Sequence, residues 1–228
     1  SFLAILKGRK KPIYMMRKAD HVITCTPHLD SFVRKYNQRT TDISSTINTD
    51  NYIPINDYSN EKTLTIGWSG SHSTSKYVYL LQEVLREISK ELEFKLLVIG
   101  DKSFHIEGVA CEAINWVEET EVNDLQRIDI GIYPLPQEEW VLGKSGLKAL
   151  QYMALGIPTI ATAIGANYRV IENGVSGVLV ETDLAWKSAI EEYILNPELR
   201  RSHGEMARKR VERLYSVKAN EPIYLDVI

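Results

Sequence analysis

The stretch Phe94-Lys95-Leu96-Leu97-Val98-Ile99-Gly100 decides the fold, because it is a strand-length run that is apolar apart from one lysine. Such a run predicts a strand buried on both faces, as in a parallel sheet covered by helices. Segments of strand and helix type alternate around it. We expect further strands at 64–68, 109–116, 128–133, 157–162 and 177–180, and helices at 75–92, 121–127, 145–155, 167–172, 184–195 and 198–215. This alternation predicts an α/β, Rossmann-like parallel sheet with helices on both faces.

Length and composition limit the class of protein. The chain has 228 residues, which corresponds to one large domain or about one and a half ordinary ones. Its 27 basic and 30 acidic side chains give a net charge of −3, which excludes a strongly basic nucleic-acid binder. Cys25 and Cys111 cannot form a disulfide framework, so we expect a reduced, cytoplasmic setting. The sequence lacks the ~18 consecutive apolar residues of a membrane span.

The first 62 residues differ in composition from the rest. We expect short strands at 21–26 and 43–47, a helix at 28–36, and a linker at 48–62 that is rich in Asn, Asp, Pro and Ser. A basic cluster precedes them, formed by Lys7, Arg9, Lys10 and Lys11. This cluster is typical of a solvated helix end or loop, and weak contact with a membrane surface is the alternative interpretation.

The loop after the strand at 64–68 is the first candidate site, since doubly wound sheets bind ligands at the carboxyl ends of their strands. Its residues 69–74, SGSHST, combine glycine with hydroxyl groups, and their backbone N–H groups would suit a phosphate. The alternative is a tight turn with a Ser or Thr helix cap. The loop lacks GxGxxG and the Lys-Ser/Thr pair of a P-loop, so neither a dinucleotide-binding nor an NTPase motif is present.

Residues 143–158, GKSGLKALQYMALGIP, carry the sharpest signal. Lys144, Lys148 and Gln151 lie at helical spacing on a stripe separate from the apolar one. Lysines at the start of a helix oppose its macrodipole, which attracts anions there. A bound diphosphate would reverse this cost, whereas two solvent-facing lysines are the alternative.

Other polar positions carry weaker signals. Asn167 follows a strand and is interpreted either as a helix cap or as a ligand contact, and the acidic run at 118–121 is typical of a solvated helix start. His72 is the one histidine in a candidate ligand loop. The histidines and cysteines lack the spacing of metal ligands, and the GxSxG motif of a serine hydrolase is absent. We therefore predict no metal site and no serine nucleophile.

Taken together, these segments resemble the C-terminal domain of family 4 glycosyltransferases of the GT-B fold. The likeness runs in order over roughly residues 64–180. It rests on residues 66–71, 73–74, 77–78, 133–136, 139–140, 143–148, 151–158, 165–167 and 172–177. It implies that residues 1–57 are the remnant of an N-terminal acceptor domain plus linker, that 58–215 form the donor-binding domain, and that 216–228 form a C-terminal crossover helix.

The resemblance implies a retaining transfer of a sugar from a nucleotide-sugar donor to an acceptor hydroxyl, in glycan or surface polysaccharide synthesis. It assigns Lys144 and Lys148 to neutralising the diphosphate leaving group. The substrate-binding residues that it implies are Ser69, Gly70, Ser71, Ser145, Gly146 and Leu147 at the diphosphate, Trp116 and Val117 at the base, Gln151 at the ribose or nearby, and Glu139 and Asn167. We expect no cofactor and no metal ion.

One departure concerns the group that contacts the sugar. Many family members carry two glutamates eight residues apart, and the matching positions here are Gly143 and Gln151. We expect Glu138 or Glu139 to substitute for the first of them.

Activity and location follow from the same likeness. Because most of the acceptor domain would be missing, we expect this chain to bind a donor without transferring sugar alone. The expected partners are a nucleotide sugar and an acceptor glycan or lipid-linked sugar, in the cytoplasm or at the inner face of a membrane. The alternatives are a non-catalytic nucleotide- or sugar-binding module of this fold and a sugar-phosphate isomerase with a GT-B layout.

Overall fold

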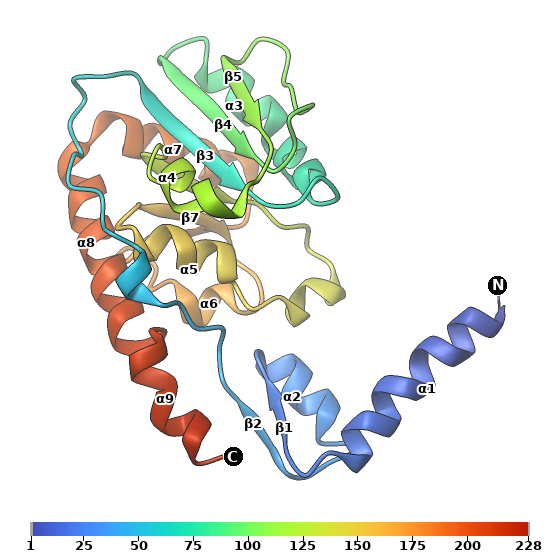
Figure 1. Ribbon diagram of the computed structural model, residues 1–228. Coiled ribbons are helices and arrows are strands. Elements are labelled where there is room, and N and C mark those ends of the chain that lie inside the picture. Colours follow the sequence, from blue (N-terminus) through green and yellow to red (C-terminus); the bar gives the residue numbers. More distant parts are fainter. Residues whose placement is uncertain (1, 228) are drawn as a thin grey trace.

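The computed structural model describes the backbone of residues 2–227 and the side chains of residue 8 and residues 10–227. Its main body is a six-stranded parallel sheet (Figure 1). The strands are β3 (Leu64–Ser69), β4 (Phe94–Ile99), β5 (Cys111–Ile114), β6 (Ile130–Tyr133), β7 (Thr159–Thr162) and β8 (Val178–Val180). They lie in the order β5-β4-β3-β6-β7-β8, and every neighbouring pair is parallel. The predicted parallel sheet is confirmed.

Helices cover both faces of this sheet, as predicted. In β4, Leu96 and Val98 point to one face, Leu97 and Ile99 point to the other, and none is more than 1% exposed. The first face packs against α3 (Gln82–Ile88) and α7 (Asp183–Leu195). The second face packs against α4 (Glu121–Leu125), α5 (Leu147–Ala154) and α8 (Pro197–Leu214). Burial on both sides explains the apolar run that begins at Phe94.

The strand order reverses in the middle of the sheet. The chain enters at β3, adds β4 and β5 on one side, and then crosses over to add β6, β7 and β8 on the other. β3 and β6 are neighbours, with Ile66 opposite Ile130. Crossovers that leave such a pair in opposite directions open a crevice at the carboxyl ends of the two strands.

A separate two-stranded parallel sheet precedes the main one. In it β1 (Val22–Thr24) pairs with β2 (Thr40–Asp42), and α2 (Pro27–Val33) connects them. The strand predicted at 43–47 is therefore wrong, because the strand ends at Asp42. Ile43 and Ile47 are buried, but Ile47 makes a single bridge to Ser216 instead of a strand pairing. Burial at both positions produced the strand-like pattern.

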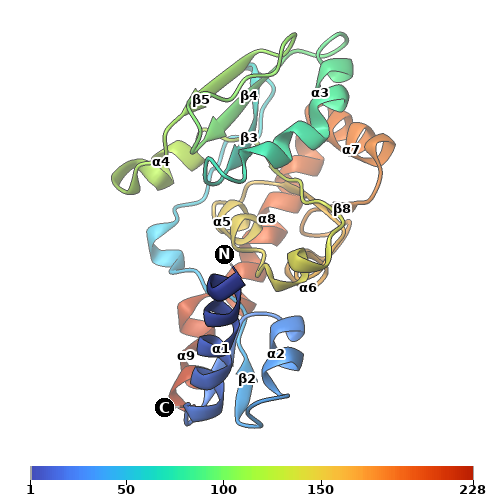
Figure 2. The same ribbon diagram turned by 90° about the vertical axis from the view of Figure 1, so that its right-hand side faces the viewer.

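A helix stands at each end of the chain. Helix α1 (Phe2–Lys18) projects away from the six-stranded body, and α9 (Val217–Leu225) follows α8 back towards β1 and β2 (Figures 1 and 2). Lys10 and Lys11 of the basic cluster are exposed on α1, whereas the side chains of Lys7 and Arg9 lie outside the described residues. Within the part of the chain that is described, no helix is both long enough and apolar enough to cross a membrane.

Short elements complete the fold. The helix predicted at 75–92 begins as a 3-10 helix and ends as α3 at Ile88. Of the apolar residues at helical spacing that predicted it, Val78, Leu81, Leu85 and Ile88 are buried, and Leu92 is half-buried beyond the end of the helix. The short elements are the 3-10 helices η1 (Thr49–Asn51), η2 (Ser75–Leu81), η3 (Glu118–Thr120) and η4 (Glu139–Gly143), and α6 (Asn167–Val170).

Candidate functional site

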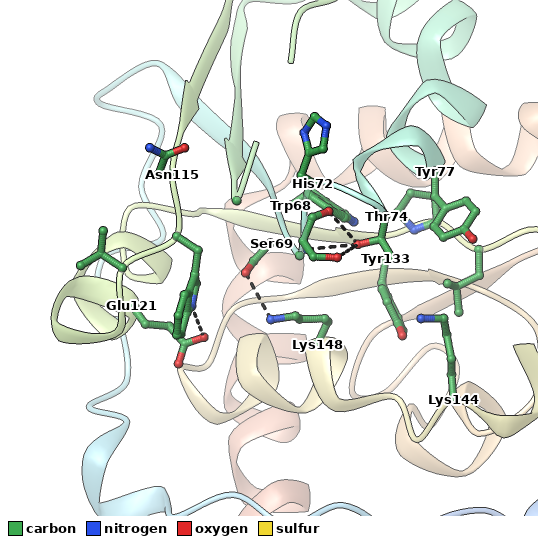
Figure 3. A pocket seen from close by; sticks show the side chains of 17 residues that line it. Trp68, Ser69, His72, Thr74, Tyr77, Asn115, Glu121, Tyr133, Lys144 and Lys148 are labelled. Atoms are coloured by element: carbon green, nitrogen blue, oxygen red, sulfur yellow. Dashed lines mark hydrogen bonds between the residues drawn. The ribbon is translucent and has the colours of Figure 1, made fainter. Parts of the chain in front are cut away.

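A cavity of about 790 Å³ opens at the carboxyl ends of β3 and β6, where the strand order reverses (Figure 3). Its lining comes from the loops that follow β3, β4, β5 and β6 and from the segment that leads into α5. Predicted site residues that line it are Ser69, Gly70, Ser71, Trp116, Val117, Lys144 and Lys148. The fold thus brings together residues that lie up to 79 positions apart in the sequence.

The loop after β3 forms one wall of the cavity, and hydrogen bonds to α5 and to the end of β4 fix its position. Ser69 is 1% exposed, and its backbone N–H donates to the Tyr152 hydroxyl at 2.7 Å. The Gly70 N–H donates to the Ile99 carbonyl at 2.9 Å. Gly100 has φ +113° and packs so closely that a Cβ there would lie 1.8 Å from the Gly70 carbonyl oxygen. The end of β4 therefore fixes the path of the cavity wall.

A buried carboxylate, Asp101, orders the next part of this loop. It accepts hydrogen bonds from the hydroxyls of Ser75 and Ser103, both at 2.6 Å, and lies 3.0 Å from Nδ1 of His72. The hydrogen bonds from Ser103 and Ser75 hold the pKa of Asp101 well below its usual range. Asp101 is therefore ionised at neutral pH and anchors the turn that presents Ser71 and His72 to the cavity.

Two lysines near the start of α5 face the same cavity (Figure 3). Nζ of Lys148 lies 3.1 Å from Oε1 of Gln151 and 3.5 Å from Oγ of Ser69. Nζ of Lys144 lies 5.3 Å from the centre of the Trp140 ring. Burial lowers the pKa of both lysines, and Glu121 opposes this shift at Lys148.

These two ammonium groups make an anion-binding arrangement. Among the described residues, no carboxylate forms an ion pair with either lysine. The first turn of α5 contains no acidic residue, and its N-cap, Gly146, makes no side-chain capping bond. The N-terminal N–H groups of α5 and the two ammonium groups thus favour an anion at the same edge of the cavity.

Both the oxygen and the nitrogen of the Gln151 side-chain amide make hydrogen bonds. It is 5% exposed, its Oε1 accepts from Lys148, and its Nε2 lies 3.1 Å from both the Tyr52 hydroxyl and Oε1 of Glu121. The same Glu121 oxygen accepts from Nε1 of Trp116 at 2.8 Å. Glu121 lines the cavity and Gln151 does not. In the sequence analysis, Gln151 is predicted to bind substrate and Glu121 is interpreted as part of a solvated helix start.

Three other predicted residues are not among those that line the cavity. Glu139 is exposed at the start of η4, and Leu147 is 40% exposed at the start of α5. Ser145 accepts a hydrogen bond from Ser45 at 2.7 Å. This contact ties the lysine-bearing segment to the residues that follow β2.

Gly146 and Asn167 stabilise the backbone conformation of two turns near the site. Gly146 adopts φ +77° where the chain turns into α5, a conformation that favours glycine. Asn167 is 1% exposed and donates from Nδ2 to the Thr162 carbonyl at 2.8 Å. Its amide closes the turn between β7 and α6 but does not cap the helix, because the N-cap of α6 is Ala166 and makes no side-chain capping bond.

The cavity also contains residues that sequence reasoning did not select. Besides Glu121, these include Tyr77, Asn115 and Tyr133. Burial raises the pKa of Tyr133 to about 12, so its hydroxyl is protonated at neutral pH. Asn115 follows β5 and Tyr133 ends β6, so their place at the carboxyl end of a strand is the signal that could have found them. Within the described residues, no cluster of three or more His, Cys, Asp or Glu side chains could hold a metal ion.

Known proteins similar to this chain share both sequence and fold with it. Residues 63–196, more than half of the chain, match the family described as Glycosyl transferases group 1. Over 180 residues the chain is 30% identical to N-acetyl-alpha-D-glucosaminyl L-malate synthase of Bacillus anthracis, and the match covers 68% of this chain and 44% of that protein. The chain therefore spans less than half the length of this curated relative.

Three solved structures with the same fold show the extent of the likeness. Anabaena HepE in complex with UDP and glucose superposes with a TM-score of 0.76 at 14% identity, over 96% of this chain and 66% of that one. S. aureus TarM, in complex with UDP, Fondaparinux and alpha-GlcNAc-glycerol, gives 0.71 at 19% identity, over 97% and 46%. Sucrose-phosphate synthase of Thermosynechococcus elongatus gives 0.70 at 19% identity, over 95% and 60%.

These structural similarities confirm the predicted Rossmann-like fold of GT-B type. The family match covers the strands, loops and helices that build the cavity, from β3 to the end of α7. The chain belongs to the glycosyl transferases group 1 family.

Proposed function

We propose that this chain is the donor-binding part of a retaining glycosyltransferase, which transfers a sugar from a nucleotide-sugar donor to an acceptor hydroxyl. The observation that carries the proposal is the placement of Lys144 and Lys148 in one cavity, at the start of α5, without carboxylate partners among the described residues. The diphosphate of such a donor supplies the negative charge that this edge of the cavity lacks.

The chemistry depends on stabilising a leaving group. When the bond between the sugar's anomeric carbon and the diphosphate oxygen breaks, negative charge grows on that oxygen. Two preoriented ammonium groups and the N-terminus of α5 stabilise this charge more in the transition state than in the ground state. We propose that these groups act without a metal ion, and that the sugar retains its anomeric configuration.

The nucleoside end of the donor is assigned to the loop after β5. Trp116 and Val117 line that part of the cavity, and Trp116 is 45% exposed. The UDP bound in the HepE and TarM structures supports a nucleoside diphosphate as the ligand class here. The acceptor is proposed to be a glycan or a lipid-linked sugar, since those TarM and HepE structures hold sugars as well.

Thermal unfolding with UDP, GDP, CDP, ADP and TDP tests donor binding directly. A ligand at a hundred times its Kd stabilises a folded protein by about 2.7 kcal/mol, which corresponds to a Tm rise of roughly 5–10 °C for a chain of this size. We expect one nucleotide to give such a rise, and Lys148→Ala and Lys144→Ala to reduce it strongly. Lys90→Ala, an exposed lysine after α3, is the matched control and should keep the full rise. Absence of any rise with all five nucleotides contradicts the proposal.

Sugar transfer is tested on the full-length protein. We expect transfer from the nucleotide sugar whose nucleotide stabilises this chain. NMR of the product should show the same anomeric configuration as in the donor. The rate of transfer should be the same with Mg²⁺ and with EDTA. Donor binding without transfer to any acceptor would instead indicate a non-catalytic binding module. A rate abolished by EDTA would refute the metal-independent mechanism alone.

Location at a membrane is a separate proposal that concerns α1. Lys10 and Lys11 are exposed on this helix, and clustered basic residues near a membrane each contribute about 1 kcal/mol of attraction to anionic lipids. We expect the chain to sediment with vesicles rich in phosphatidylglycerol, and to lose this association when Lys7, Arg9, Lys10 and Lys11 are changed to Gln. Equal sedimentation of both chains would refute it.

A further inference from the structure

Lys148, Gln151 and Glu121 form a chain of polar side chains whose two ends, Lys148 and Glu121, line the cavity, while Gln151 lies between them outside the lining. Nζ of Lys148 lies 3.1 Å from Oε1 of Gln151, and Nε2 of Gln151 lies 3.1 Å from Oε1 of Glu121. Although Glu121 and Lys148 both line the cavity, the ion pairs of the described residues do not join them. A carboxylate is thus held one side chain away from the ammonium group.

The orientation of the Gln151 amide follows from its neighbours. Its NH₂ group has two acceptors, the Tyr52 hydroxyl and the Glu121 carboxylate, so its oxygen is the end that meets Lys148. The reverse orientation would place NH₂ against an ammonium group and an oxygen against a carboxylate. Both contacts would be repulsive at a side chain that is 5% exposed. The Glu121 carboxylate and the Lys148 ammonium group therefore favour the same orientation of the amide, with its oxygen towards Lys148.

This arrangement suits a lysine that must bind an anion. A carboxylate in direct contact would neutralise the ammonium group and compete with a phosphate for its N–H bonds. A neutral amide oxygen orients the group instead. Lys148 has three N–H donors, and two of them have acceptors among the described residues, one at 3.5 Å. The charge of Glu121 meanwhile favours the protonated form of Lys148 against the effect of burial.

We propose that Glu121 and Gln151 are positioning residues that keep Lys148 charged, aimed into the cavity and available to the diphosphate of the ligand. This inference rests on the proposed function, because it concerns how the diphosphate-binding lysine is held. Neither residue needs to contact the diphosphate itself.

The test compares the wild type with Glu121→Gln, Gln151→Glu and the double variant that exchanges the two side-chain types. Calorimetry measures the affinity for pyrophosphate and for the stabilising nucleoside diphosphate, and urea unfolding measures stability. We expect Glu121→Gln to weaken both affinities roughly tenfold, at the lower end of the range for groups that orient ligand-binding residues at metal sites. Glu119→Gln removes an exposed carboxylate two residues away and should keep the wild-type affinity.

The exchange variant separates positioning from simple structural support. Gln151→Glu alone places two carboxylates side by side and should lower both stability and affinity. The double variant again has one carboxylate and one amide, so its stability should return towards the wild type. Its carboxylate now contacts Lys148 directly, however, so its affinity for pyrophosphate should stay low. Recovery of affinity together with stability would overturn the proposal.

The pH dependence of pyrophosphate binding gives a second readout. Binding should weaken at alkaline pH as Lys148 loses its proton, and this loss should begin at lower pH in Glu121→Gln. The other titratable side chains that line the cavity or contact Gln151 are Tyr52, His72, Tyr77, Tyr133 and Lys144, and they are the same in both chains. An identical pH profile for the two chains would overturn the proposal.

Failure of this inference is distinguishable from failure of the proposed function. If Lys148→Ala binds pyrophosphate as the wild type does, the proposed function itself fails. If Lys148→Ala loses binding while Glu121→Gln keeps it, the positioning role fails and the proposed function stands. If Glu121→Gln weakens the nucleotide but not pyrophosphate, Glu121 contacts the nucleoside directly and the positioning role is again refuted.

Discussion

Replacing Gly100 by alanine tests whether the end of β4 sets the shape of the cavity. The added Cβ would lie 1.8 Å from the Gly70 carbonyl oxygen, whereas real Cβ atoms essentially never come closer than 3.0 Å, so Gly70 must move by about 1.2 Å or more. Alanine at φ +113° also costs about 1–3 kcal/mol of backbone strain. Since Gly70 lies between Ser69 and Ser71 in the cavity wall, both stability and ligand binding should fall.

Gly108→Ala is the matched control for this change. Gly108 also has a positive φ, +83°, but a Cβ there meets no atom within 4 Å. We expect Gly108→Ala to lower the free energy of unfolding through strain alone and to leave nucleoside-diphosphate affinity unchanged. Gly100→Ala should weaken that affinity at least tenfold, which corresponds to about 1.4 kcal/mol. Urea unfolding and calorimetry measure the two quantities, and wild-type affinity in Gly100→Ala would refute the reasoning.

Three further substitutions probe other parts of the structure. The Arg200 guanidinium, 0% exposed, donates to backbone carbonyls of the linker and α7, so Arg200→Met should lower the free energy of unfolding by about 3 kcal/mol in urea. The pKa of Asp101 is lowered in the folded state, so its contribution to stability is present above about pH 3.9 and is lost as pH falls through the lower folded pKa. The stability difference between the wild type and Asp101→Asn should therefore shrink during acid titration below pH 4, and a constant difference would contradict this. Trp140→Ala should weaken pyrophosphate binding about threefold in calorimetry, because Lys144 loses the cation–π contact, worth about 0.5–1 kcal/mol, that orients it. Trp140→Phe retains an aromatic ring and should keep most of the affinity.

Most of the fold could be predicted because its signals are local. Each strand of the main sheet is short, apolar and separated from the next by a helix or a polar turn, and Gly156 and Pro158 mark the end of α5. The prediction failed where burial has a non-local cause. Ile43 and Ile47 look like a strand because both are buried, but the bridge that holds Ile47 comes from Ser216, at the far end of the chain.

The site residues, too, could be predicted only where the sequence carries a local signal for them. Lys144 and Lys148 could be selected from the sequence because two lysines at a helix start contradict a local electrostatic preference. Glu121 could not, because an acidic residue at the start of α4 satisfies that preference and looks like an ordinary solvated helix start. Its importance lies in its contacts with Gln151, 30 residues away, and with Trp116.

The buried charge of Lys148 affects the stability of this domain. Because burial lowers its pKa in the folded state, the charged ammonium group reduces the stability of the unliganded fold at every pH below that folded pKa. The neutral Gln151 amide and the distant Glu121 carboxylate offset this cost only in part, since neither takes up the charge in a direct ion pair. A diphosphate bound at Lys148, as we propose, would offset this cost and so would stabilise the fold. A charged group that lowers the stability of the empty fold is expected at a binding site and not in a structural core, which agrees with the proposed function.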